Sequence, residues 1–219
     1  MFENIKRKIK LSKLKDKKYS FLYDTNIAND EYIVLDTETT GLNPKKDEIL
    51  SIGAVRIKNN KILTTQSFEI FIKPSNKISA KSITIHQIRD HDLKDAVDIN
   101  EALEELLYFI SNLPIVGYYI SFDINILNTY LKKYIGSTLH NEQIELSSMY
   151  YKRYKKHSAH EFVDLKFDTI IEKLDIPKLS KHDALNDAIM SAMMFLKLKN
   201  IPLYKGAYSW YILLNFIIK

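Results

Sequence analysis

The chain has 219 residues, of which 46% are hydrophobic and 27% are charged. This length allows one domain with a substantial core and is short for two. There is no cysteine, which excludes disulfides and thiolate zinc sites. Because no run of about 20 apolar residues occurs and the first residues lack the apolar segment of a secretion signal, we expect a cytoplasmic protein without membrane insertion.

The net charge of +5 is concentrated near the N-terminus. Residues 1–18 contain eight Lys and Arg residues against two acids, so the remainder of the chain is nearly neutral. We therefore treat residues 1–30 as a basic N-terminal extension. Three interpretations stay open: contacts to nucleic-acid phosphates, an amphipathic helix that docks on the body or on a membrane surface, and a solvated, partly frayed segment.

A short apolar run, Ile33 to Leu35, ends abruptly at an acidic motif. Such a run is typical of a buried strand, which we place at residues 31–37. Asp36 and Glu38 are two residues apart, so in a strand their side chains point to the same face. Two carboxylates this close repel each other unless one keeps its proton or a hard divalent cation binds. The alternative is a strand that ends at a solvated acidic turn.

A hairpin and a helix are predicted next along the chain. Strands at 49–58 and 62–72 are joined through an Asn-Asn pair, a sequence that favours a tight turn. A helix at 99–111 follows, because its apolar residues recur at helical intervals and Asp98 stands at the N-cap position.

A further acid, Asp123, comes after a short predicted strand at 115–119. The apolar stripe that follows predicts a helix with Ser121 as its N-cap, so Asp123 would lie in the first turn. Taken alone, this acid could serve only to favour the helix macrodipole. The Tyr- and Lys-rich stretch at 150–157 suits binding of single-stranded nucleic acid, but a partly buried helix with a charged outer face is the preferred interpretation.

The last cluster, His182 and Asp187, lies at the start of a helix predicted over residues 183–197. Ala184 and Ala188 flank Asp187, and their small side chains would let the helix approach a strand closely. The residues expected on its core face are Leu185, Ile189, Met193 and Leu196. An imidazole accepts a proton at neutral pH, so His182 is either a general base or an ordinary surface histidine.

These motifs together resemble the DEDDh group of 3′-5′ exonucleases, the DnaQ-like family that includes the proofreading subunit of bacterial DNA polymerase III. The resemblance covers roughly residues 31–198. The family's first motif is Asp-X-Glu followed by Thr-Gly, here DTETTGL. Its second is Phe-Asp, here Phe122 and Asp123, and its third is a His five positions before an Asp, here His182 and Asp187. The sister DEDDy group has a Tyr four positions before its last Asp, where this chain has an Asp.

The resemblance implies an α/β fold, an RNase H-like mixed β-sheet flanked by α-helices, with which the predicted order of elements agrees. We place the exonuclease domain at residues 31–200. The apolar segment 201–219 is too short to span a bilayer and is expected to pack on the domain as a C-terminal tail.

A two-metal hydrolysis of phosphodiester bonds from the 3′ end is also implied by the resemblance. The positions that match metal ligands, for two Mg²⁺ or Mn²⁺ ions, are Asp36, Glu38, Asp123 and Asp187. His182 matches the base that deprotonates the attacking water. The positions that match substrate contacts are Thr39, Thr40, Leu42, His86 and Phe122. Tyr118 and Tyr119 stand where relatives usually have His-Asn, which affects the surroundings of the second motif and not the ligands.

The expected activity is that of a 3′-5′ exodeoxyribonuclease whose partner is a nucleic acid with a free 3′ end, single-stranded DNA before RNA. Thr39 favours DNA, because oligoribonucleases of the group usually have Met there. Proofreading, repair and turnover are all compatible, with or without a DNA polymerase partner. The alternatives are an exoribonuclease of the same group and a nucleic-acid-binding polymerase-accessory module with weak or no catalysis, which would have no need of four clustered carboxylates.

Overall fold

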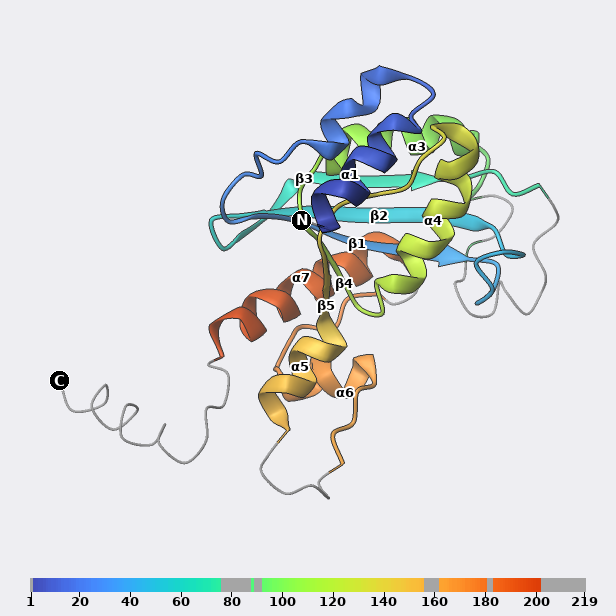
Figure 1. Cartoon of the computed structure of the whole chain (residues 1–219). Helices are drawn as coiled ribbons and strands as arrows, with labels where there is room; N and C mark the ends of the chain where they lie inside the picture. Colours follow the sequence, from blue (N-terminus) through green and yellow to red (C-terminus); the bar gives the residue numbers. More distant parts are fainter. Residues whose placement is uncertain (1, 76–87, 89–91, 156–161, 181–182, 202–219) are drawn as a thin grey trace.

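A computed structural model describes residues 2–75, 88, 92–155, 162–180 and 183–201. Its centre is a five-stranded mixed sheet of order β3-β2-β1-β4-β5, with helices around it (Figure 1). The strands are β1 (Glu31–Thr39), β2 (Ile49–Lys58), β3 (Lys61–Phe71), β4 (Ile115–Gly117) and β5 (Gln143–Glu145). The helices are α1 (Phe2–Ser12), the 3-10 helix η1 (Lys17–Tyr23), α3 (Ile99–Ile110), α4 (Ser121–Tyr134), α5 (Leu146–Tyr154), α6 (Phe167–Lys173) and α7 (Ala184–Asn200). The predicted α/β class with a mixed sheet flanked by helices is confirmed.

Strand β1 lies in the middle of the sheet and is buried on both faces. It pairs with β2 in the antiparallel sense and with β4 in the parallel sense. Ile33 and Leu35 point into the apolar cluster under α3 and α4, whereas Val34 points into the cluster under α7. A continuous apolar run is therefore required here, since both faces are covered.

The hairpin between β2 and β3 has its turn at the predicted Asn pair. Asn59 and Asn60 both have positive φ, 50° and 58°, as a two-residue turn matched to the strand twist requires. Lys58 and Lys61 pair across the turn, so the strand bounds predicted from the sequence hold to within one residue.

Helix α7 crosses the sheet on the face opposite α3 and α4, and the core face predicted for it is wrong. The expected residues Leu185, Ile189, Met193 and Leu196 are only partly buried. The side chains that are buried belong to Ala184, Ala188, Met190, Ser191, Ala192, Met194, Phe195 and Leu198. The reason is close packing: a Cβ on Gly53 of β2 would lie 2.1 Å from the Ala184 carbonyl carbon. Small residues therefore face the sheet at the start of the helix, as predicted for Ala184 and Ala188, and larger side chains such as Met194 and Phe195 fill the core farther along.

The start of α4 also differs from the prediction. Ser121 is the first helical residue, and the N-cap is Ile120, which has no side-chain cap. Strand β4 ends at Gly117, before the predicted position, because Tyr119 has a φ of 52° and turns the chain toward the helix. The second acidic motif is thus delivered by a tight strand–helix connection.

The N-terminal residues fold onto the α3–α4 side of the sheet. Tyr19, Leu22 and Tyr23 of η1 are buried in the main apolar cluster, whereas most side chains of α1 before it are exposed, as expected for a solvated segment. Hydrogen bonds from Arg7 to the Tyr23 carbonyl and from Lys10 to the Leu139 carbonyl dock α1 on the body, and contacts to nucleic-acid phosphates stay a prediction. The division into 1–30, 31–200 and 201–219 stays a prediction, and residues 202–219 of the apolar tail lie outside the described part of the chain.

Helix α5 confirms the preferred interpretation of the Tyr- and Lys-rich stretch as far as residue 154. Tyr150 is buried and Lys152 is exposed on the opposite side. Strand β5, helix α6 and η1 were not predicted. Within the described residues, no helix combines the length and apolar character needed to cross a membrane.

Candidate active site

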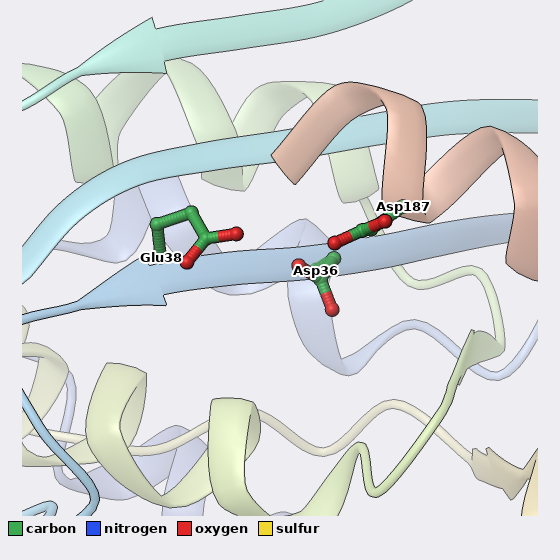
Figure 2. Close-up of side chains that lie close together, drawn as sticks. All are labelled: Asp36, Glu38 and Asp187. Carbon is green, nitrogen blue, oxygen red and sulfur yellow. The ribbon is translucent and has the colours of Figure 1, made fainter. Parts of the chain in front are cut away.

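Three carboxylates converge where α7 passes over the second half of β1. Asp36 and Glu38 point to the same face of β1, and Asp187 comes from the first turn of α7. One carboxylate oxygen from each lies within 4.8 Å of the others. Figure 2 shows Asp187 directed at Asp36 with Glu38 beside them. Residues 150 positions apart in the sequence therefore share one small volume.

Helix α7 brings Asp187 to this place through its packing and its N-cap. The Asp183 carboxylate accepts a hydrogen bond of 2.9 Å from the Asn186 backbone N–H, which fixes the first turn. Gly53 pairs with Asp36 across β1 and β2 and leaves room for the backbone at Ala184. The depth of the helix on the sheet thus sets the distance between Asp187 and Asp36.

The fourth acid, Asp123, reaches the site from the start of α4. It is 4% exposed, and its Oδ1 accepts a hydrogen bond of 2.5 Å from the Thr37 hydroxyl. Thr37 stands between Asp36 and Glu38 and points to the opposite face of β1. Asp123 is outside the tight trio but close enough for its charge to raise the pKa of Asp36. The hydrogen bond from Thr37 to Asp123 was not predicted from the sequence. The position of Thr37 between Asp36 and Glu38 could have indicated that it lies near the site.

The electrostatics of the site penalise negative charge. Burial, and then repulsion from Asp123, Asp187 and Glu38, raises the pKa of Asp36 well above its usual value. Burial followed by repulsion from Asp187 and Asp123 raises the pKa of Glu38 to about 8. Burial likewise raises the pKa of Asp123 to about 7, and the Thr37 hydrogen bond opposes that shift. Without a cation the group cannot be fully ionised at neutral pH.

This donor set fits a hard divalent cation. Among the described residues, no lysine or arginine forms a salt bridge with Asp36, Glu38 or Asp123. Buried carboxylates without an internal counter-charge, with oxygens a few ångströms apart, are the ligands that Mg²⁺ and Mn²⁺ prefer. The cation would supply positive charge to Asp36, Glu38 and Asp123, for which no described lysine or arginine provides it.

The other predicted site residues lie around the end of β1 and the start of α4. The Thr39 hydroxyl donates to the Gly41 carbonyl at 2.7 Å, and the Thr40 hydroxyl accepts from the Glu48 backbone N–H at 3.0 Å. Leu42 is 88% exposed. Phe122 is partly buried in the first turn of α4. His182 and His86 lie outside the described residues.

The two tyrosines that replace the usual family residues have well-defined contacts. The Tyr118 hydroxyl donates to the Leu165 carbonyl at 2.6 Å, so this ring is tied to the segment before α6. The Tyr119 backbone N–H donates to the Glu145 carboxylate at 2.9 Å, which also caps α5. These bonds hold the connection between β4 and α4, and therefore the position of Asp123.

With this geometry in place, comparison with known proteins decides the family. The sequence profile of the family described as Exonuclease (RNase_T) matches residues 33–195, which include every described acid of the site. The chain belongs to this exonuclease family. The resemblance to DnaQ-like exonucleases is thereby confirmed, and residues 33–195 form a domain of the exonuclease type.

Relatives of this exonuclease domain include much longer proteins. It is 35% identical over 175 residues to "DNA polymerase III PolC-type" of Thermotoga petrophila and 29% identical over 184 residues to the protein of that name from Bacillus subtilis. The matches cover 80% and 82% of this chain but 12% of each relative. The chain therefore corresponds to one region of those polymerases.

Solved structures of other exonucleases share the fold. Exonuclease I superposes with a TM-score of 0.67 and 16% identity, covering 79% of this chain and 41% of that one. Cell-death related nuclease 4 gives a TM-score of 0.66 with 18% identity, covering 84% of this chain and 71% of that one. The predicted RNase H-like architecture is confirmed by this likeness.

Proposed function

We propose that the protein is a metal-dependent 3′-5′ exonuclease that removes nucleotides from single-stranded DNA. The observation that carries the proposal is the trio of Asp36, Glu38 and Asp187, whose oxygens lie within 4.8 Å of one another in a family of exonucleases. An accessory module that only bound nucleic acid would gain nothing from concentrated, partly protonated acids beside a polyanion, since they would repel its phosphates.

The four acids would hold two divalent cations, Mg²⁺ or Mn²⁺. Bound there, the cations would stabilise negative charge on the attacking and leaving oxygens of an in-line displacement. Asp36 and Glu38 of β1, Asp187 of α7 and Asp123 of α4 would hold these cations together, since the charges of the other three acids all act on Asp36. Thr37 would orient Asp123 through its hydrogen bond, which fixes one carboxylate oxygen.

His182 is proposed as the general base. It stands one residue before the Asp183 N-cap of α7, so it belongs to the segment that leads into the helix carrying Asp187. An imidazole takes up a proton near neutral pH, whereas a carboxylate that holds a cation is a poor base. Its role would be to remove the proton of the attacking water.

Residues around the end of β1 would seat the terminal nucleotide. Leu42, 88% exposed, is free to wedge against a base, and Phe122 offers an aromatic edge beside Asp123. Thr39 and Thr40 would approach the 3′ hydroxyl through backbone and side-chain groups, and His86 would contact the substrate strand. Stacking on an aromatic ring stabilises each base by about 1–3 kcal/mol.

DNA is the proposed substrate because the relatives are DNA polymerases. Crystal structures of exonuclease I, a protein of the same fold, contain dT13 and dA16 oligonucleotides, which supports a single-stranded substrate. The PolC-type relatives support a proofreading or repair role beside a DNA polymerase in the cytoplasm. An exoribonuclease has no comparable support among these relatives.

Digestion of a 5′-labelled oligonucleotide tests the proposal. Wild-type protein with Mg²⁺ or Mn²⁺ should shorten single-stranded DNA one nucleotide at a time from the 3′ end, and chelator should stop it. The matched RNA should be cut more slowly. The variant Asp36→Ala is the control, and an identical product ladder from it would refute the enzyme. Faster cutting of RNA would make the protein an exoribonuclease instead.

A further inference from the structure

A cavity lined by lysines lies between the N-terminal helix and the far end of α4. Its volume is about 360 Å³, at the lower end of the range for small-ligand sites. The lining residues are Lys6, Ile9, Lys10, Lys13, Lys132, Gly136, Ser137 and Thr138. Four of the eight are lysines and none is acidic, so the cavity presents concentrated positive charge.

The lysines of the cavity come from two elements of the fold. Lys6, Lys10 and Lys13 follow one another at spacings of four and three, so they share one side of the chain as α1 ends. Like charges at such spacings destabilise a helix by about 0.2–0.5 kcal/mol per pair. Lys132, in the last turn of α4, adds a fourth positive charge from a different element. A bound anion would be attracted by positive charge from both elements.

The walls of the cavity are held in place by hydrogen bonds. The Ser137 hydroxyl donates to the Lys10 carbonyl at 2.8 Å, and the Lys15 backbone N–H donates to the Ile135 carbonyl at 2.9 Å. The Lys10 ammonium donates to the Leu139 carbonyl, which fixes this charge at the cavity. Gly136 has a φ of 79° and brings the chain so close that a Cβ would lie 2.5 Å from the Lys13 carbonyl oxygen.

We propose that this cavity, which we call the lysine cavity, binds the phosphate backbone of a nucleic-acid strand whose 3′ end lies at the acidic site. Lysine binds phosphate as a point charge and needs no fixed approach, which suits a flexible single strand. Lys132 and Asp123 lie on the same helix, nine residues or about 14 Å apart. At about 3.4 Å per nucleotide, this separation corresponds to about four nucleotides.

The separate locations of the lysine cavity and the acidic site would let one bind the strand and the other hydrolyse it. The acidic site repels phosphates unless cations are bound, so affinity for the strand must come from elsewhere. The lysine cavity supplies that attraction without lying near the carboxylates it would otherwise neutralise. The proposal rests on the nucleic-acid chemistry of the family and does not require that the acidic site cleaves DNA.

Binding of single-stranded DNA tests the lysine cavity directly. The variant Lys6→Gln, Lys13→Gln, Lys132→Gln is compared with the control Lys61→Gln, Lys94→Gln, Lys173→Gln, which removes three exposed lysines elsewhere. Fluorescence anisotropy with an oligonucleotide of about 20 nucleotides, in chelator, is measured over a range of salt. The slope of log affinity against log salt should be smaller by about 2 in the cavity variant, because each phosphate contact contributes about 0.7.

The length of the substrate separates this role from a general loss of folding. An oligonucleotide of about two nucleotides spans roughly 7 Å at this spacing and cannot reach the cavity from the acidic site. Its hydrolysis should therefore be unchanged in the cavity variant, while affinity for the long strand falls. Equal DNA affinity and equal salt slopes for the two triple variants would overturn the proposal. So would unchanged DNA binding with lost binding to phosphatidylserine vesicles, since the exposed Ile5 and Ile9 would then mark a membrane surface. Absence of hydrolysis by wild type would contradict the proposed function and leave these binding results intact.

Discussion

The two ends of β1 handle buried acids in opposite ways. Glu31, at the start of the strand, is 8% exposed and pairs across the ladder with Lys58, which forms a salt bridge with it. Toward the other end, Asp36 pairs with Gly53. The space over that glycine admits α7, which adds a third carboxylate, Asp187.

This difference shows what the second end is built to receive. At one end the neighbouring β2 residue is Lys58, whose ammonium group pairs with the acid. At the other end it is Gly53, which has no side chain and so lets α7 approach. An acid neutralised from within the chain contributes to the fold, whereas a group of acids that the described residues do not neutralise depends on a cation from solution. The same strand thus carries a structural ion pair and a candidate metal centre.

Replacing Asp187 by Asn should have the largest effect. It removes one charge from the trio and should lower the rate of DNA hydrolysis about a thousandfold, which equals about 4 kcal/mol of transition-state stabilisation. The matched change at the other end, Glu31→Gln, should leave the rate near that of wild type and affect stability only. Initial rates on a labelled oligonucleotide measure both, and equal losses in the two variants would break the comparison.

Filling the gap opposite Asp36 should act through α7. In Gly53→Ala the new Cβ would meet backbone atoms of Ala184 and Leu185, so the helix must move, at a cost of about 3 kcal/mol. Asp187 should move with it, and activity should fall as well. Gly41→Ala is the control, because there the Cβ meets only the Asp47 side chain. Urea unfolding of both variants checks the difference, and equal stabilities would contradict the close packing of α7.

The acids at the end of β1 should make the metal-free protein less stable as the pH rises. In the unfolded chain Glu38 loses its proton near 4.5, whereas the pKa of Glu38 in the folded protein is about 8. Between these values the folded state binds more protons, so the free energy of unfolding should decrease with rising pH, by about 2 kcal/mol or more. Urea titrations in chelator at a series of pH values test this. Saturating Mg²⁺ should flatten the dependence, and Glu31→Gln should not.

Removing the Thr37 hydroxyl should give the smallest of these effects. In Thr37→Val, Asp123 loses its hydrogen bond, and activity should fall about tenfold through poorer orientation of one carboxylate. Thr37→Ser keeps the hydroxyl and should retain activity. The ratio of the two rates is the measurement, and a ratio near one would remove Thr37 from the site.

The elements that could be predicted are those whose signals are local. The apolar run before Asp36, the Asn pair of the hairpin and the Asp98 cap specify their structures through neighbouring residues alone. The convergence of Asp187 on Asp36 was expected through the family resemblance and the small residues Ala184 and Ala188. The sequence around Ala184 and Ala188 does not indicate that the helix packs on Gly53, since that contact depends on the register of the sheet.

The errors have a common physical origin in tertiary packing. Periodicity assigned Leu185, Ile189, Met193 and Leu196 to the core face of α7, but the close approach of the helix to β2 turns the face with Ala184 and Ala188 toward the sheet. Ser121 is a good N-cap by propensity, and the left-handed backbone at Tyr119 moved the helix start by one residue. The Thr37–Asp123 bond joins two motifs 86 residues apart, and only the folded chain brings them together.

Titration of the metal-free protein with Mn²⁺, followed by calorimetry in buffers of different ionisation enthalpy, tests the central claim most directly. Wild type and Glu31→Gln should bind the cation and release protons near neutral pH, because the raised pKa values of Glu38 and Asp123 leave them partly protonated beforehand. The double variant Asp36→Asn, Asp187→Asn should bind at least about tenfold more weakly. Equal affinity in the double variant, or no binding by wild type, would contradict the assignment of these acids to a metal centre.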